Sequence, residues 1–127
     1  MKNTELKNNK FMNAMIEAMK RSTDDMFSGA VKLAREYITS TDRYNMNEIM
    51  IGNNLSYFDN QDEARQAVNV MKIAKLKSFL LVDHGTPLMD EIHYFINAGA
   101  KFGEPVEIEA VNKWNEKENI KGIRFTL

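Results

Sequence analysis

The hydrophobic pattern of this chain is organised around one short apolar run. Residues 79–82 read Phe-Leu-Leu-Val, with no polar residue among them. A continuous apolar run of this length is typical of a strand that is buried on both faces. We therefore predict a central strand at 79–82, inside the molecule.

Amphipathic segments of helical period precede and follow this strand. The segment 59–77 begins with an acidic turn and then repeats apolar residues at spacings of three and four. The segment after the strand opens on Thr86 and Pro87, which suit a helix cap and the first helical position. It stops at Gly99, which suits the left-handed position after a helix. These segments predict a helix–strand–helix unit around the central strand.

Two more amphipathic segments, 3–21 and 22–38, are joined by a short connection and predict an N-terminal helical hairpin. In the second helix Lys32 and Glu36 fall on the polar face, so we expect both side chains in solvent. Residues 44–51 fit either a short helix or a strand, because their apolar part is too short for periodicity to decide.

The end of the chain has the period of strands. Apolar and polar residues alternate at 105–111 and again at 122–127, and the polar stretch 115–119 joins the two runs. This pattern predicts an antiparallel hairpin. The predicted fold class is therefore α+β, in a single domain over 1–127. It combines an N-terminal helical hairpin, the central helix–strand–helix unit and a C-terminal antiparallel β-hairpin on a small sheet.

Charges on the predicted hairpin give a more detailed expectation. Glu107, Glu109 and Arg124 fall on the same face if the two runs alternate as predicted. Opposite charges on neighbouring strands attract each other, so we expect Arg124 to lie beside these two glutamates.

Composition excludes several classes of protein. The chain has 127 residues, no cysteine and a net charge of −1. The lack of cysteine excludes disulfide frameworks, zinc–thiolate sites and cysteine nucleophiles. The balanced charge argues against a broad positive surface for nucleic acid, although a local basic patch stays open. No apolar run approaches the roughly 20 residues that cross a bilayer, and the first residues are polar, so we expect a cytoplasmic protein with no membrane partner.

Reactive side chains gather after the predicted strand. Asp83 and His84 follow it directly and could form an acid–base pair. His84, Asp90 and His93 could supply nitrogen and oxygen ligands to a metal. The chain has no HExxH motif, phosphate-binding loop or dinucleotide fingerprint. We therefore expect no catalytic residues, no metal and no cofactor, and keep a small hydrolase or metal-dependent enzyme at the Asp83/His84 loop as an alternative.

A second alternative rests on a resemblance. The run 62–82 resembles, in its pattern, the recognition helix and following strand of winged-helix DNA-binding domains. The resemblance implies a DNA-binding regulator whose helix enters a groove. The residues available for that contact are Arg65, Gln66, Asn69 and Lys72.

Aromatic residues outside the predicted core faces point to a third kind of site. They are candidate anchors for a protein partner, although they could instead cover the ends of the core. The residues are Tyr44, Tyr57, Phe58, Phe102 and Trp114. Our main expectation is a small non-enzymatic binding or regulatory protein that contacts a macromolecular partner, a protein rather than DNA. A phage-type inhibitor or modulator of a host protein is one example.

Overall fold

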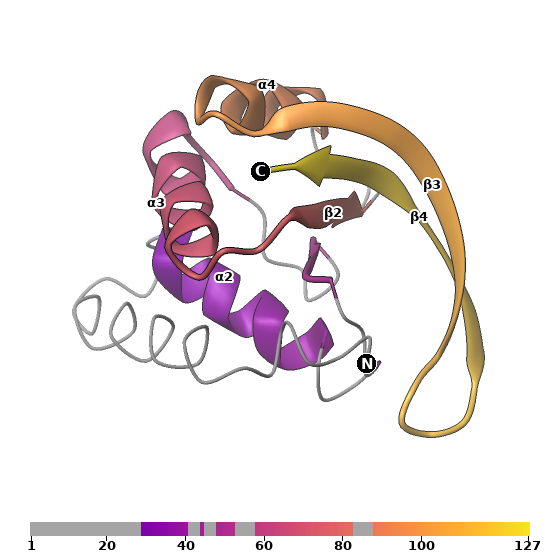
Figure 1. The fold of residues 1–127 in the computed structure, drawn as a ribbon. Helices are drawn as coiled ribbons and strands as arrows, with labels where there is room; N and C mark the ends of the chain where they lie inside the picture. Colours follow the sequence, from indigo (N-terminus) through magenta and orange to yellow (C-terminus); the bar gives the residue numbers. More distant parts are fainter. Residues whose placement is uncertain (1–28, 41–43, 45–47, 53–57, 83–87) are drawn as a thin grey trace.

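The computed structural model describes residues 29–40, 44, 48–52, 58–82 and 88–127. The predicted first helix, the start of the second and the Asp83/His84 loop lie outside the described residues. The described elements, drawn in Figure 1, are α2 (Gly29–Ile38), β1 (Met50–Ile51), α3 (Gln61–Ile73), β2 (Ser78–Val82), α4 (Leu88–Asn97), β3 (Lys101–Val111) and β4 (Lys117–Thr126).

The four strands form one mixed sheet in the order β1-β2-β4-β3. Strand β1 pairs with β2 in parallel, with Met50 opposite Leu80, and β4 pairs antiparallel with both β2 and β3. The predicted α+β class is therefore confirmed, and the C-terminal hairpin joins the sheet beside the central strand. The sequence allows either a helix or a strand at 44–51, and the structure has a strand at Met50 and Ile51.

Strand β2 is buried on both faces, as its continuous apolar run predicts. Phe79 and Leu81 belong to the larger core cluster, whereas Leu80 and Val82 belong to the smaller one. Successive side chains of a strand point to opposite faces, so a strand between two apolar clusters has no polar position. The prediction of a central, buried strand at 79–82 is confirmed.

The larger cluster fills the space between the sheet and the three described helices. Leu33 of α2, Met71 of α3 and Phe95 of α4 meet Phe79 and Phe125 there. The ring centroids of Phe79 and Phe125 lie 5.2 Å apart in a stacked arrangement, and those of Phe79 and Phe95 lie 5.0 Å apart. Aromatic pairs at such distances add about 0.5–1.5 kcal/mol to the gain from burial.

Helix α3 begins at Gln61, with Asn60 as its N-terminal cap. The side chain of Asn60 accepts a hydrogen bond from the backbone N–H of Glu63, and Oε1 of Glu63 accepts one from the N–H of Asp59. Polar side chains that satisfy free N–H groups in this way stabilise a helix start. Helix α4 is followed by Gly99, whose φ of 104° confirms the predicted left-handed position.

Two expectations for α2 are wrong. Lys32 and Glu36 are buried, not exposed, because α2 packs against both α3 and β1 and therefore has more than one buried stripe. Nζ of Lys32 lies 2.7 Å from Oε1 of Glu63 and 3.2 Å from Oδ2 of Asp59. A buried charge needs such partners, and here the start of α3 supplies them.

Phe79→Ala tests the aromatic centre of the core. Removing a fully buried phenylalanine leaves a cavity, so we expect the free energy of unfolding to fall by about 3–5 kcal/mol. Ile73→Ala is the control, because Ile73 is 67% exposed and should change stability by no more than about 0.5 kcal/mol. Denaturant unfolding measures both, and equal losses in the two variants would contradict this packing.

Candidate binding site on the hairpin arm

Strands β3 and β4 continue well past the sheet. The last residue pair between β2 and β4 is Val82 with Gly122, and five more β3–β4 pairs follow, from Glu107 with Lys121 to Val111 with Lys117. We call residues 107–121 the hairpin arm. Figure 1 shows it as a long curved ribbon that runs down one side of the molecule.

The two strands are longer than the alternating pattern predicts. Strand β3 starts four residues earlier, at Lys101, with an irregularity between Phe102 and Glu104. Gly103 permits this irregularity, since a Cβ there would stand 2.3 Å from the backbone oxygen of Arg124. Strand β4 starts at Lys117, inside the stretch predicted as a polar loop. Polar residues form a strand there because the register with β3 continues to this end, with Lys117 opposite Val111, Glu118 opposite Ala110 and Asn119 opposite Glu109.

The arm has an apolar inner face and a charged outer face. Ala110 and Ile120 are buried in the smaller core cluster together with Tyr44. On the outer face, Lys117 lies 3.9 Å from Glu109. The inner face of the arm therefore packs against the smaller core cluster, while its charged outer face is in solvent.

Asn112 organises the turn at the end of the arm. Its Oδ1 accepts hydrogen bonds from the backbone N–H groups of Trp114 and Glu116, at 2.9 and 3.0 Å. Its Nδ2 donates to carboxylate oxygens of Glu116 and Glu118, at 3.1 and 2.7 Å. Asn115 takes the left-handed conformation, with φ of 65°, and closes a three-residue hairpin loop.

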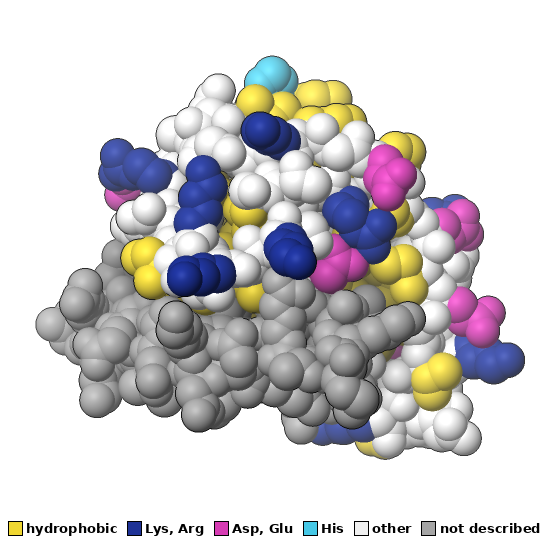
Figure 2. All heavy atoms as spheres, viewed as in Figure 1, with side chains coloured by type: hydrophobic (Ala, Val, Ile, Leu, Met, Phe, Trp, Pro, Cys, Tyr) yellow, Lys and Arg dark blue, Asp and Glu magenta, His cyan; other side chains and the backbone are white. Residues whose placement is uncertain are grey.

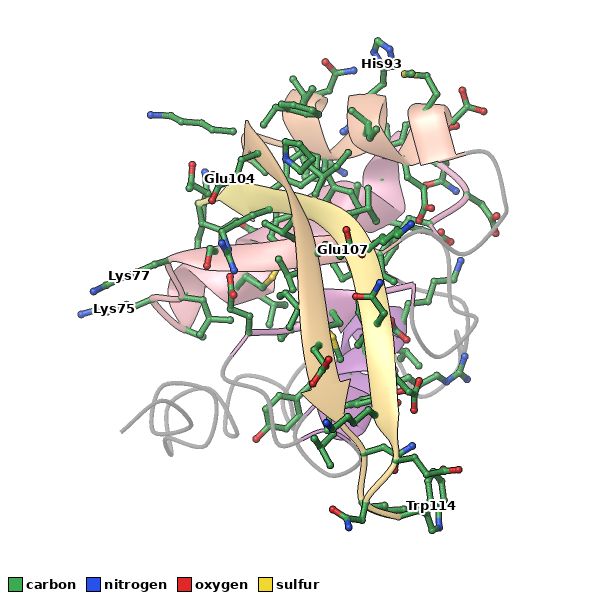
Figure 3. All side chains as sticks on the ribbon, turned by 90° about the vertical axis from the view of Figure 1, so that its right-hand side faces the viewer. Lys75, Lys77, His93, Glu104, Glu107 and Trp114 are labelled. Carbon is green, nitrogen blue, oxygen red and sulfur yellow. The ribbon has the colours of Figure 1, made fainter. Side chains whose placement is uncertain are left out.

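Trp114 lies at the tip of this loop. Its side chain is 58% exposed, and Figure 3 shows it at the far end of the arm, pointing away from the body. Nζ of Lys113 lies 5.3 Å from the centre of its ring, which is within the range of a cation–π contact. The tip therefore presents a large aromatic surface on an ordered loop.

A charged cluster fixes the root of the arm. The guanidinium of Arg124 donates two hydrogen bonds to Glu48, of 3.0 Å from Nε and 2.8 Å from Nη2, and a third of 3.3 Å to Glu104. The hydroxyl of Ser78 donates to the same carboxylate of Glu48 at 2.5 Å. The expectation that Arg124 lies beside Glu107 and Glu109 is wrong, because the register places those residues opposite Lys121 and Asn119.

These contacts alter the acidity of both groups. Burial alone would raise the pKa of Glu48, but the hydrogen bonds from Arg124 and Ser78, with the attraction of the guanidinium, lower this pKa below its ordinary value of 4.5. The hydrogen bond to Glu48 raises the pKa of Arg124. Both groups are therefore charged at neutral pH, and the cluster links β2, β3 and β4 with the chain before β1.

The predicted aromatic anchors are only partly exposed. Tyr44 and Phe58 are buried, with 5% and 1% of their surface exposed, so the expectation that they offer an accessible surface is wrong. Phe58 packs edge-on against Phe95, and the hydroxyl of Tyr44 donates to Glu118 at 2.8 Å. Trp114 and Phe102 are exposed, and Tyr57 lies outside the described residues.

The residues proposed for a DNA groove lie on α3 without forming one uniform surface. Arg65 forms an ion pair with Asp62. Gln66 accepts a hydrogen bond from the N–H of Gly29 at 2.9 Å, whereas Asn69 and Lys72 are exposed. Helix α3 connects the parallel strands β1 and β2. The recognition helix of a helix-turn-helix instead packs directly after another helix, so the resemblance to winged-helix domains does not extend to this arrangement.

Of the residues proposed for an enzyme or a metal, the structure describes Asp90 and His93. His93 is exposed on α4, and Figure 3 shows it pointing away from the body. Within the described part of the chain, no group of three His, Cys, Asp or Glu side chains is arranged to hold a metal ion.

Comparison of the chain with models of known protein families, with curated proteins and with solved structures finds no match. Among the described residues, no helix has both the length and the apolar content that a membrane span requires.

The tip was predicted only in part from the sequence. The sequence indicates Trp114 as a candidate anchor, but its hydrophobic pattern does not indicate Asn112 and Asn115. A signal existed, because two asparagines three residues apart are suited to accept backbone hydrogen bonds and to adopt the left-handed conformation in a tight turn.

Glu48→Gln tests the root of the arm through its pH dependence. A folded-state pKa below the unfolded value adds stability at higher pH, and this stability is lost as the pH falls through the folded pKa. At pH 7 we expect the variant to be about 1–3 kcal/mol less stable than the wild type, as for hydrogen bonds to a charged group. The difference should shrink as the pH falls below 4.5, the ordinary value of Glu48. Denaturant unfolding across pH 3–7 measures it.

Glu104→Gln is the matched control for that experiment. Glu104 contacts the same arginine, but its side chain is 67% exposed, so its loss should cost less than about 1 kcal/mol. A stability difference for Glu48→Gln that is independent of pH would contradict the proposed linkage.

Asn112→Ala tests the order of the tip. Losing the amide leaves two backbone N–H groups without their acceptor, so we expect the free energy of unfolding to fall by about 1–3 kcal/mol. Chymotrypsin should also cleave after Trp114 faster in this variant, because a loosened loop fits a protease better. Unchanged cleavage would show that Asn112 does not order the loop.

Proposed function

We propose that this chain is a non-catalytic binding protein that recognises another protein through the tip of the hairpin arm. The observation that supports the proposal is Trp114, 58% exposed at the end of an ordered projection. Tryptophan is enriched among the few interface residues that contribute most of the binding energy.

The order of the loop strengthens this proposal. The side chain of Asn112 accepts hydrogen bonds from the backbone N–H groups of Trp114 and Glu116. The loop therefore has little conformational freedom to lose when a partner binds. Binding by a pre-organised loop avoids part of the entropic cost of ordering an interface. Two further features limit the conformational freedom of the arm. They are the ion pairs of Arg124 with Glu48 and Glu104 at its root and its buried inner face.

The chemistry of the tip describes the partner. An indole ring on a narrow projection fits an apolar pocket on the surface of a folded protein better than a flat surface. A protein that fills such a pocket competes with any other ligand of that pocket. Regulation or inhibition of the partner is therefore the role we propose.

A photo-crosslinker placed at two positions tests this function. The chain with benzoylphenylalanine in place of the exposed Lys113, beside an intact Trp114, should crosslink to one protein in a bacterial lysate. The control carries the same group in place of Ile73, which is 67% exposed but lies at the end of α3. Here we expect no defined product.

Trp114→Ala completes the test. An exposed side chain contributes little to folding, so the variant should unfold within about 0.5 kcal/mol of the wild type. It should also lose the partner that the wild type retains. The same crosslinked proteins from both positions, or full retention of the partner by Trp114→Ala, would contradict the proposal.

A further inference from the structure

Four lysines lie at the end of the molecule where α3 ends and β2 and β3 begin, and we call them the lysine cluster. Nζ of Lys72 lies 3.4 Å from the backbone oxygen of Gly99, two residues before β3. The first residues of β2 and β3, Ser78 and Lys101, both lie opposite Thr126. The members of the cluster are Lys72, Lys75, Lys77 and Lys101.

The cluster faces solvent. All four residues are exposed, and Figure 3 shows Lys75 and Lys77 extending side by side away from the body, in a direction different from that of Trp114. In Figure 2 basic side chains are spread over the viewed face, and acidic ones lie beside some of them. The positive charge at this end is therefore accessible.

Within the described part of the chain, no carboxylate forms an ion pair with a lysine of the cluster. Elsewhere Arg65, Lys117 and Arg124 each form an ion pair with a carboxylate. Neighbouring like charges without partners create a positive potential that attracts anions.

The backbone at Lys75 gives independent support. Lys75 has φ of 63°, in the left-handed region, directly after the end of α3. Its N–H donates to the oxygen of Lys72 at 3.0 Å, and the N–H of Leu76 donates to the oxygen of Met71 at 3.1 Å. This is the helix ending in which glycine is usual, because a side chain is disfavoured at positive φ. The protein is less stable with lysine at this position than it would be with glycine. What lysine adds is a charge, which glycine lacks.

The helix dipole explains only part of the cluster. Cations near a helix C-terminus are favourable, and Lys72 and Lys75 both lie near the end of α3. Lys77 and Lys101 stand at the starts of strands, where the macrodipole of α3 gives no such reason. The dipole also does not explain the left-handed backbone at Lys75. A ligand that contacts all four lysines explains both the lysines at the strand starts and this backbone conformation.

We propose that the lysine cluster binds the phosphate backbone of a nucleic acid. Protein interfaces are depleted in lysine, so an exposed group of lysines without arginine fits a partner protein poorly. The exposed apolar side chains beside the cluster, Ile73 next to Lys72 and Phe102 next to Lys101, are two single residues on separate elements and form no apolar helix face for insertion into a membrane. Lysines contact phosphates as point charges and carry no information about base sequence. This binding is independent of sequence, and it uses a surface separate from the tip of the arm.

The salt dependence of binding to a labelled 20-base-pair DNA duplex tests the proposal. Four lysine–phosphate contacts predict a slope of log Kobs against log[salt] of about −3 to −4. Fluorescence anisotropy on the full chain measures this slope. A duplex of the same composition and scrambled sequence should bind equally well.

Lys75→Gly separates a role in binding from a role in structure. The variant should melt at a higher temperature than the wild type, because glycine relieves the left-handed backbone. It should also bind the duplex about 5- to 10-fold more weakly near 0.1 M salt, with a slope smaller by about one. Lys117→Ala is the control of equal charge, since Lys117 lies on the arm and should leave binding nearly unchanged.

Several results would overturn the proposal. Duplex binding by Lys75→Gly as tight as that of the wild type would show that the charge is not used. Equal weakening by Lys117→Ala would show that only net charge matters. Tighter binding to phosphatidylserine vesicles or to polyglutamate than to the duplex, at the same salt, would assign the cluster to a lipid surface or to an acidic protein.

Discussion

The burial of β2 on both faces and its pairing on both edges is the constraint on which the rest of the described structure depends. Phe79 and Leu81 anchor the helical side of the sheet, while Leu80 and Val82 anchor the other side. Full burial of four such side chains contributes about 6–12 kcal/mol at about 1.5–3 kcal/mol each. This is comparable with the whole net stability of a small domain, about 5–15 kcal/mol. One strand therefore separates the two clusters and joins β1 to β4.

The arm follows from this strand. Pairing with β2 fixes the direction of β4. Past Val82, where β2 ends, β4 stays paired with β3, and these two strands form the arm. Arg124 then joins β4 to Glu48 and Glu104 at the root, and the inner face of the arm is buried beside Tyr44. The geometry of the core thus sets the position of Trp114, which is the residue proposed to bind a partner.

Local features were predictable from the sequence because their cause is local. The apolar run 79–82, the acidic first turn of α3 and the left-handed Gly99 each depend on residues within one or two turns. The burial of Lys32 was not predictable in this way, because its partner Glu63 lies 31 residues away.

The same distinction applies to the candidate sites. The sequence suggests Phe58 as an anchor, but Phe95 of α4 covers it, a contact that no short pattern indicates. The lysine cluster is assembled from α3, the turn after it and the start of β3, which meet only in the folded chain. Trp114 is predictable as a candidate because it lies outside the predicted core faces, next to the polar stretch that joins the two alternating runs.

Amide hydrogen exchange of the native protein, read residue by residue, tests the central claim most directly. If β2 is paired on both edges and buried on both faces, its amides exchange among the slowest in the chain. That includes the N–H of Leu80, which donates to the oxygen of Ile49 at 2.9 Å. The amides at the arm tip should exchange far sooner. Exchange of the Leu80 and Leu81 amides as fast as that of Trp114 would contradict the account.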